Sequence, residues 1–195
     1  MLPFRLQIKL FLANPNAVDL SAISALYQRW IQDKTLEGQL IDVADYRHVF
    51  QGPSVVLIAF DSDYAIENRD GRLGLLYTRK RQTDLDFRSQ LRTSLHLALT
   101  AAHLIESEPS FNPHPRFRAD EIEIRFADRL QLPNTSESYD QVKEDLRIAL
   151  TELYASDSVE IERVEQDPRY LLTVVARSEA AFRISELIQY LQAAH

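Results

Sequence analysis

A repeated order of hydrophobic patterns along the chain is the feature that most constrains its fold. Residues 4–12 alternate between apolar and polar side chains, which predicts a strand with one buried face, and residues 122–126 repeat this pattern. Each strand is followed by a Pro-Asn turn, at Pro15 and Pro133, and then by an amphipathic helix. Pro15 precedes Val55 by 40 positions (55 − 15), and Pro133 precedes Leu172 by 39 (172 − 133). The spacing therefore agrees across a whole β-α-β unit.

The rest of each half continues the same order. A strand with mixed faces comes next, then a strand that is apolar on both faces, and then a closing helix. In the first half we expect these three elements at residues 41–46, 54–60 and 84–106, in that order. In the second half we expect them at residues 159–164, 170–176 and 178–193. This order predicts an α+β protein of two tandem β-α-β-β-α halves that resemble a ferredoxin-like layer. We expect the helices on one face of a mainly antiparallel sheet. The pattern fits one continuous sheet as well as two separate ones.

The two halves differ in one respect. We assign residues 1–106 to the first half, residues 107–116 to a proline-rich linker and residues 117–195 to the second half. Residues 61–80 of the first half form an expected extra hairpin, with a turn at Asn68-Arg69-Asp70-Gly71, that has no counterpart in the second half. Any specific function is therefore expected in the first half.

Charge also distinguishes the halves. The polar face of the first strand is basic, at Arg5 and Lys9, whereas the corresponding faces of the second half are acidic, at Glu121, Glu123, Glu160 and Glu162. Opposite charges on neighbouring strands attract each other. We therefore expect the halves to meet through these faces.

Composition excludes several classes of site. The chain of 195 residues contains no cysteine, which rules out disulfides, thiolate nucleophiles and cysteine-ligated metals. Its four glycines, at positions 38, 52, 71 and 74, cannot form a dinucleotide-binding, P-loop or hydrolase-elbow motif. No metal site and no cofactor are expected, because the five histidines lack ligand spacing.

Partners and location follow from charge and hydrophobicity. The formal net charge of −7 disfavours nucleic acid as the main partner, although a basic cluster between Arg69 and Arg92 leaves a local patch as an alternative. No apolar run approaches the ~20 residues that span a bilayer, and charged residues interrupt the apolar N-terminus. We expect a cytoplasmic protein that has no membrane segment.

Polar residues gather at the strand ends of the first half. Asp45 and His48 precede the apolar strand, and Asp61 and Asp63 follow it. A histidine beside a carboxylate can act as a general acid–base pair, so His48, Asp45 and Asp63 are the candidate catalytic residues. A simple up-and-down chain path would place the two groups at opposite ends of the strands.

A second candidate site is an anion site. Arginine and lysine side chains collect phosphate or carboxylate groups, and tyrosine can add a hydroxyl donor. The residues that could do so beyond the expected turn are Arg72, Tyr77, Arg79 and Lys80.

Two segments resemble a group of uncharacterised bacterial proteins. They are Gly52–Tyr64 (GPSVVLIAFDSDY) and Asp70–Lys80 (DGRLGLLYTRK). The resemblance implies a bacterial cytoplasmic protein. It carries no assigned activity, so no residue role transfers from it.

The sequence thus favours a non-enzymatic cytoplasmic binding or assembly protein, because the patterns that would fix a reaction are absent. A second copy of the chain, a protein partner or a small anionic ligand are the expected partner classes. The alternative is a small-molecule enzyme, or an anion-binding protein, that uses the strand-end residues of the first half.

Overall fold

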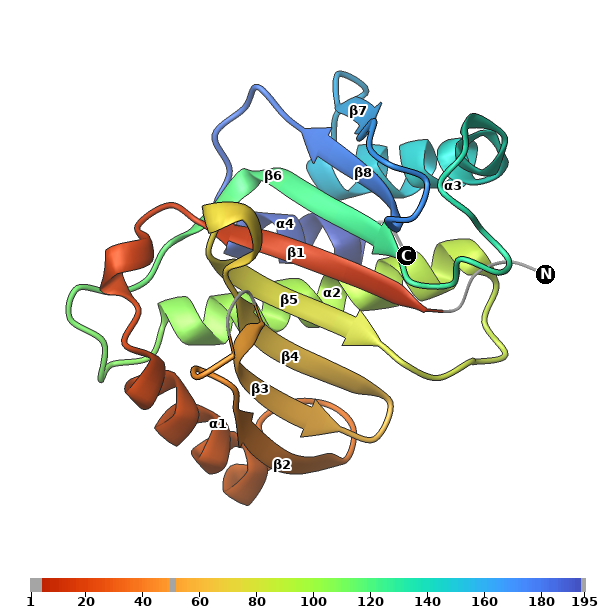
Figure 1. Ribbon diagram of the computed structural model, residues 1–195. Helices are drawn as coiled ribbons and strands as arrows, with labels where there is room; N and C mark the ends of the chain where they lie inside the picture. Colours follow the sequence, from red (N-terminus) through yellow and green to blue (C-terminus); the bar gives the residue numbers. More distant parts are fainter. Residues whose placement is uncertain (1–4, 50–51, 194–195) are drawn as a thin grey trace.

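The computed structural model describes residues 5–49 and 52–193, and their strands form one eight-stranded sheet in the order β2-β3-β4-β5-β1-β6-β8-β7 (Figure 1). Every neighbouring pair of strands is antiparallel. The strands are β1 (Leu6–Leu12), β2 (Leu40–Asp45), β3 (Pro53–Ala59), β4 (Ser62–Glu67), β5 (Gly74–Arg79), β6 (Phe117–Phe126), β7 (Glu160–Arg163) and β8 (Leu172–Arg177). The helices are α1 (Leu20–Asp33), α2 (Phe87–Glu106), α3 (Ser136–Tyr154) and α4 (Ile184–Ala193), with short 3-10 turns η1 (Pro15–Ala17) and η2 (Arg69–Gly71).

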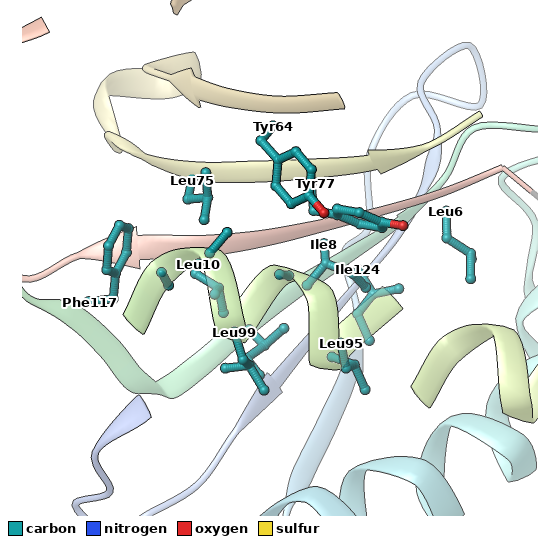
Figure 2. Packing of buried hydrophobic residues seen from close by; sticks show 14 of the residues in the cluster. Leu6, Ile8, Leu10, Tyr64, Leu75, Tyr77, Leu95, Leu99, Phe117 and Ile124 are labelled. Carbon is teal, nitrogen blue, oxygen red and sulfur yellow. The ribbon is translucent and has the colours of Figure 1, made fainter. Parts of the chain in front are cut away.

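The four helices cover one face of the sheet, as the sequence predicts, and leave the other face open (Figure 1). Alternation along β1 explains the division, because successive side chains of a strand point to opposite faces. Leu6, Ile8 and Leu10 are fully buried under the helices, whereas Gln7 and Lys9 lie on the open face. Figure 2 shows this core, in which leucines of α2 meet the apolar side chains of β1 and β5.

Side-chain caps set where three of the helices begin. Asp19 accepts a hydrogen bond from the backbone N–H of Ser21 at the start of α1, and Asp86 accepts one from Ser89 at the start of α2. Thr135 caps α3 in the same manner. Such caps satisfy backbone donors that the first helical turn leaves without partners.

One helix is shorter than its sequence pattern predicts. The pattern gives a helix over residues 178–193, but α4 begins only at Ile184. Glu186 accepts a hydrogen bond from the backbone N–H of Arg183 at 2.7 Å, which closes the first turn at that point. Ser178 instead continues the ladder of β8, since its N–H donates to the carbonyl of Asp120.

The halves meet in one continuous sheet, joined by the antiparallel pair β1 and β6. Lys9 stands opposite Glu123 in this pair, but its Nζ donates to Glu67 of its own half at 2.9 Å. On the open face, Arg125 with Glu67 and Arg72 with Glu121 form ion pairs that cross between the halves. Contact through these charged faces is therefore present, with partners that differ from those expected. The reason is that β4 carries Glu67 to the same face as Lys9.

Candidate functional site

The candidate acid–base residues lie apart. Asp45 stands opposite Val55 of β3, whereas Asp63 stands opposite Ile58. They are separated by about 10 Å along the strands and about 10 Å across them, given ~3.4 Å per residue and ~4.8 Å per strand. The structure therefore keeps Asp45 and Asp63 apart. This is the arrangement that the up-and-down chain path predicts.

Arg47, rather than His48, engages Asp45. The Nε of Arg47 lies 2.9 and 2.8 Å from the two carboxylate oxygens, and its backbone N–H also donates to Asp45. These hydrogen bonds lower the pKa of Asp45 to about 2, so it is a weak base at neutral pH. His48 is exposed, and its ring lies 6.5 Å from that of Tyr46.

Of the four candidate anion-binding residues, two already have carboxylate partners. Arg72 forms a bidentate pair with Glu121 on the open face, at 3.1 and 2.8 Å. Lys80 donates to Asp63 and to the carbonyl of Ala59, both at 2.7 Å. These two cations hold the sheet together and lie apart from the other two candidates.

Tyr77 and Arg79 do lie together. They are two residues apart on β5, so both point to the helix-covered face. Arg79 is the last residue of β5 and stands opposite Ser62, the first residue of β4. The side chains of these three residues border one cavity of about 180 Å³.

Arg79 is a buried cation without a carboxylate partner among the described residues, and its polar neighbour is the Tyr77 hydroxyl. The exposed fraction of Arg79 is 8%. Within residues 5–49 and 52–193 its Nε finds no hydrogen-bond acceptor, and no carboxylate lies within ion-pair distance of its guanidinium. Buried charges are normally paired, because removing them from water is costly. An uncompensated buried arginine therefore marks a place where an anion would be stabilised.

The neighbours of Arg79 fix the strand end on which it sits. Lys80 hydrogen-bonds the carbonyl of Ala59, and Arg81 hydrogen-bonds the carbonyl of Phe60 and stacks on its ring at 3.8 Å. Both interactions pin the turn between β3 and β4. Consequently the three consecutive basic residues at positions 79–81 have different roles, and only Arg79 faces the cavity.

The cavity, called here the Arg79 cavity, is closed by segments distant in sequence. Its lining residues are Glu37, Gly38 and Gln39 between α1 and β2, Ala59, Asp61 and Ser62 around the β3–β4 turn, Tyr77 and Arg79 of β5, and Thr93 and Leu97 of α2. The carbonyl of Gln39 accepts from the N–H of Phe60 at 2.8 Å, which holds the first two segments together. Gly38 has a φ of +97°, a conformation that glycine adopts without strain.

Of two neighbouring buried tyrosines, Tyr77 lines the cavity and Tyr64 packs against Tyr77. Figure 2 shows Tyr64 and Tyr77 side by side, with both hydroxyl oxygens toward the carboxyl end of β5, and their ring centroids are 5.2 Å apart. Burial raises the pKa of Tyr77, and the nearby Arg79 and the Ser62 and Ser94 hydroxyls offset part of that rise. The hydroxyls of Tyr64, Tyr77 and Ser94 form no hydrogen bond of good geometry in the described part of the chain, although Arg79, Ser62 and Ser94 lie near the Tyr77 hydroxyl. The hydroxyl-bearing residues that line the cavity beside Arg79 are Tyr77 and Ser62.

A larger cavity of about 450 Å³ adjoins the Arg79 cavity along α2, and the two share Glu37 and Thr93. We call it the α2 groove; its other lining residues are Leu85, Ser89, Arg92, His96, Leu191 and Gln192. Arg92 is engaged there by Glu152 at 2.6 Å and by the carbonyl of Leu191. The groove is therefore of mixed polarity, with leucines from α4 and from the segment before α2.

The open face of the sheet holds a charged network of a different kind. Lys9, Glu67, Glu123 and Arg125 are each largely buried, and each has an ion-pair partner of opposite sign. Burial alone would raise the pKa of Glu67, but Arg125 and Lys9 outweigh it and lower that pKa. A groove of about 530 Å³ borders Arg125 and Tyr170. Because the buried charges of this face are already compensated, an ionic ligand would gain less electrostatic stabilisation there than in the Arg79 cavity.

Searches against protein-family models, curated proteins and solved structures find no match for this chain. Among residues 5–49 and 52–193, no group of three or more acidic or histidine side chains is placed to hold a metal ion. No helix in that part of the chain is long and apolar enough to cross a membrane. The geometry of the Arg79 cavity is therefore the feature of this protein that bears on its function.

Sequence reasoning included Tyr77 and Arg79 but missed Glu37, Ser62 and Thr93. The pairing of Ser62 with Arg79 depends on a connection of residues 68–73 between β4 and β5, whereas the expected four-residue turn at 68–71 would pair Ser62 with Tyr77. Glu37 and Thr93 had no local signal. They reach the cavity through tertiary packing of the α1–β2 segment and of α2.

Proposed function

We propose that this protein binds a small anionic ligand in the Arg79 cavity. The observation that carries the proposal is the burial of the Arg79 guanidinium, beside a cavity, without a carboxylate partner in the described residues. A ligand carboxylate or phosphate would supply the missing charge. Guanidinium groups suit this purpose because their planar N–H groups match both anions in a bidentate manner.

The surroundings of Arg79 favour tight binding of such a group. Attraction between opposite charges grows as water is excluded, and Arg79 sits on a strand end that Lys80 and Arg81 hold in place. A pre-positioned cation loses little side-chain freedom when the ligand arrives. The hydroxyls of Ser62 and Tyr77 border the same space and can donate hydrogen bonds to anion oxygens.

Binding is favoured over catalysis by the protonation states of the buried groups. Arginine stays protonated, and burial raises the pKa of Tyr77, so neither group exchanges a proton near neutral pH. The histidine of the alternative acid–base hypothesis, His48, lies beyond the opposite end of β2 from the cavity. A ligand can be held in this cavity without a group that is poised to transform it.

We also propose that the two halves are versions of one ferredoxin-like β-α-β-β-α unit. In the second half the strand order β6-β8-β7 places the third strand between the first and the second. The first half has the same order once the β4–β5 hairpin is removed, since that hairpin lies between β3 and β1. On this view the hairpin that carries Ser62 and Arg79 is an insertion into a shared framework.

Anion binding is tested by thermal unfolding of the purified protein with acetate, inorganic phosphate and succinate. A ligand that binds only the folded state stabilises it by RT ln(1 + [L]/Kd), so the midpoint should rise with ligand concentration. The rise should disappear in Arg79→Met. The matched control is Arg72→Gln, which removes a cation from the other face and should leave the rise intact.

Two outcomes would contradict this proposal. One is that Arg79→Met retains the full response of the native protein to every anion. The other is that no anion at millimolar concentration raises the midpoint, while native mass spectrometry detects no small molecule carried by the protein.

A further inference from the structure

The rim of the Arg79 cavity carries charge opposite to that of its interior. Glu37 and Asp61 both line the cavity and both are exposed. Neither carboxylate forms an ion pair with a residue in the described ranges, and neither lies within 4.0 Å of Arg79. One site therefore presents a buried cation and, at its mouth, two carboxylates that do not neutralise it.

Glu37 is held at this position by the residues on either side. Leu36 is buried in the core, and the carbonyl of Gln39 is hydrogen-bonded to Phe60. Asp61 lies in the turn that Lys80 and Arg81 pin, and its own carbonyl accepts from the N–H of Lys80 at 2.9 Å. The separation of the acidic rim from Arg79 is thus a property of anchored backbone.

We infer that the ligand is a small zwitterion, an α-amino acid, whose carboxylate lies at Arg79 and whose ammonium group faces Glu37 and Asp61. This inference rests on the proposed function and extends it by assigning a positively charged group to the ligand. A molecule of this kind satisfies the buried cation and the free rim carboxylates together, whereas a simple anion would add negative charge beside them.

The volumes agree with this ligand class. The Arg79 cavity, about 180 Å³, equals roughly six times the ~30 Å³ that a water molecule occupies in the liquid, which suits the charged end of an amino acid. The adjoining α2 groove of about 450 Å³ would take the side chain. Because Leu85 and Leu191 line that groove, amino acids with medium or large apolar side chains should bind best.

The test is a calorimetric and thermal-shift panel of the common L-amino acids on the full-length protein. The tightest binder is then compared with its N-acetyl form, which lacks the ammonium group, and with its amide, which lacks the carboxylate. We expect each modification to weaken binding at least about 10-fold, as loss of a charge-assisted hydrogen bond would. In the double variant Glu37→Gln, Asp61→Asn the N-acetyl form should bind about as well as the free amino acid.

The panel separates failure of this inference from failure of the proposed function. If acetate, phosphate or N-acetyl amino acids bind through Arg79 as tightly as any free amino acid, the zwitterion inference is wrong and anion binding stands. If no probe responds to Arg79→Met, both are wrong. A double variant that still discriminates against N-acetyl forms would also overturn the inference. Arg79→Lys, which keeps the charge, should retain weakened binding and so show that loss in Arg79→Met is not a folding defect.

Discussion

Arg79 and Arg125 are two arginines of almost equal burial in opposite electrostatic surroundings. Their exposed fractions are 8% and 6%, and they lie on opposite faces of the same sheet. Arg125 bonds both carboxylate oxygens of Glu67 at 3.2 Å and Glu123 at 2.5 Å. Arg79 has no such partner in the described residues. Replacing each by methionine, which preserves much of the side-chain shape, should therefore change stability in opposite directions.

The magnitudes follow from what each replacement leaves behind. Arg125→Met leaves Glu67 and Glu123 with Lys9 and the more exposed Arg69, 3.9 Å from Glu67, as neighbouring cations. Breaking a buried pair in this way costs about 3–5 kcal/mol. Arg79→Met leaves no described carboxylate without its ion-pair partner, and it removes an uncompensated charge. We expect a gain of about 1–3 kcal/mol, within the range for replacing buried ionic groups by hydrophobic ones. Binding sites that carry such destabilising residues are a common source of stability–function conflict.

Urea unfolding followed by circular dichroism measures both changes. With a slope of ~2 kcal/mol per molar urea, the midpoint of Arg79→Met should rise by about 0.5–1.5 M and that of Arg125→Met should fall by about 1.5–2.5 M. Arg79→Lys keeps the buried charge and should show no rise. A midpoint of Arg79→Met that falls as far as that of Arg125→Met would refute the reasoning, because it would mean that Arg79 is already compensated.

Three further predictions concern the framework around the site. A Cβ at Gly74 would lie 2.3 Å from the carbonyl oxygen of Leu10, so Gly74→Ala should cost at least about 3 kcal/mol in urea unfolding; Gly71→Ala, which meets nothing within 4 Å, should cost only the ~1 kcal/mol of its positive φ. The pKa of Glu67 is lowered in the folded state, so the ionised carboxylate contributes its full share to the free energy of unfolding above the unfolded pKa of ~4.3. This contribution is lost as the pH falls through the pKa of the folded state. Free energies of unfolding measured between pH 3 and 6 should therefore depend less on pH in Glu67→Gln than in the native protein. A fragment of residues 1–106 leaves the β1 edge and part of the shared core uncovered, so size-exclusion chromatography should show association rather than a folded monomer; a cooperative monomeric fragment would contradict this.

The periodic spacing of hydrophobic residues in the sequence was enough to predict most of the strands and helices. The alternation in β1 places Lys9 correctly on the polar face, and the opposite charges of the two halves predict that this face meets the second half. The alternation could not identify the partner of Lys9, because period alone does not give strand order. Only the placement of β4 beyond β5 brings Glu67 onto the same face, 58 positions away in sequence.

The candidate anion site shows a different limit of sequence reasoning. Arg79 and Lys80 are adjacent on the chain and of like charge, so the sequence alone predicts one anion site that contains both. Consecutive residues of a strand point to opposite faces, however, and the structure separates them accordingly. Applying the two-residue period to the basic residues would have kept Tyr77 with Arg79 and set Lys80 apart.

The uncompensated charge belongs to the hairpin of β4 and β5. In the second half the strand end that carries a basic residue is that of β8, where Arg177 is 43% exposed and pairs with Glu162 at 3.1 Å and Glu121 at 3.7 Å. That arginine lies on the open face, where acidic neighbours and water both compensate it. In the first half the hairpin turns Arg79 under α2, and the α1–β2 segment closes the space beside it. Arg125 near the end of β6 is equally buried but paired with Glu67 and Glu123, so among the described residues the buried cation without a carboxylate partner lies in the first half. This asymmetry is the physical reason to look for ligand binding in the first half.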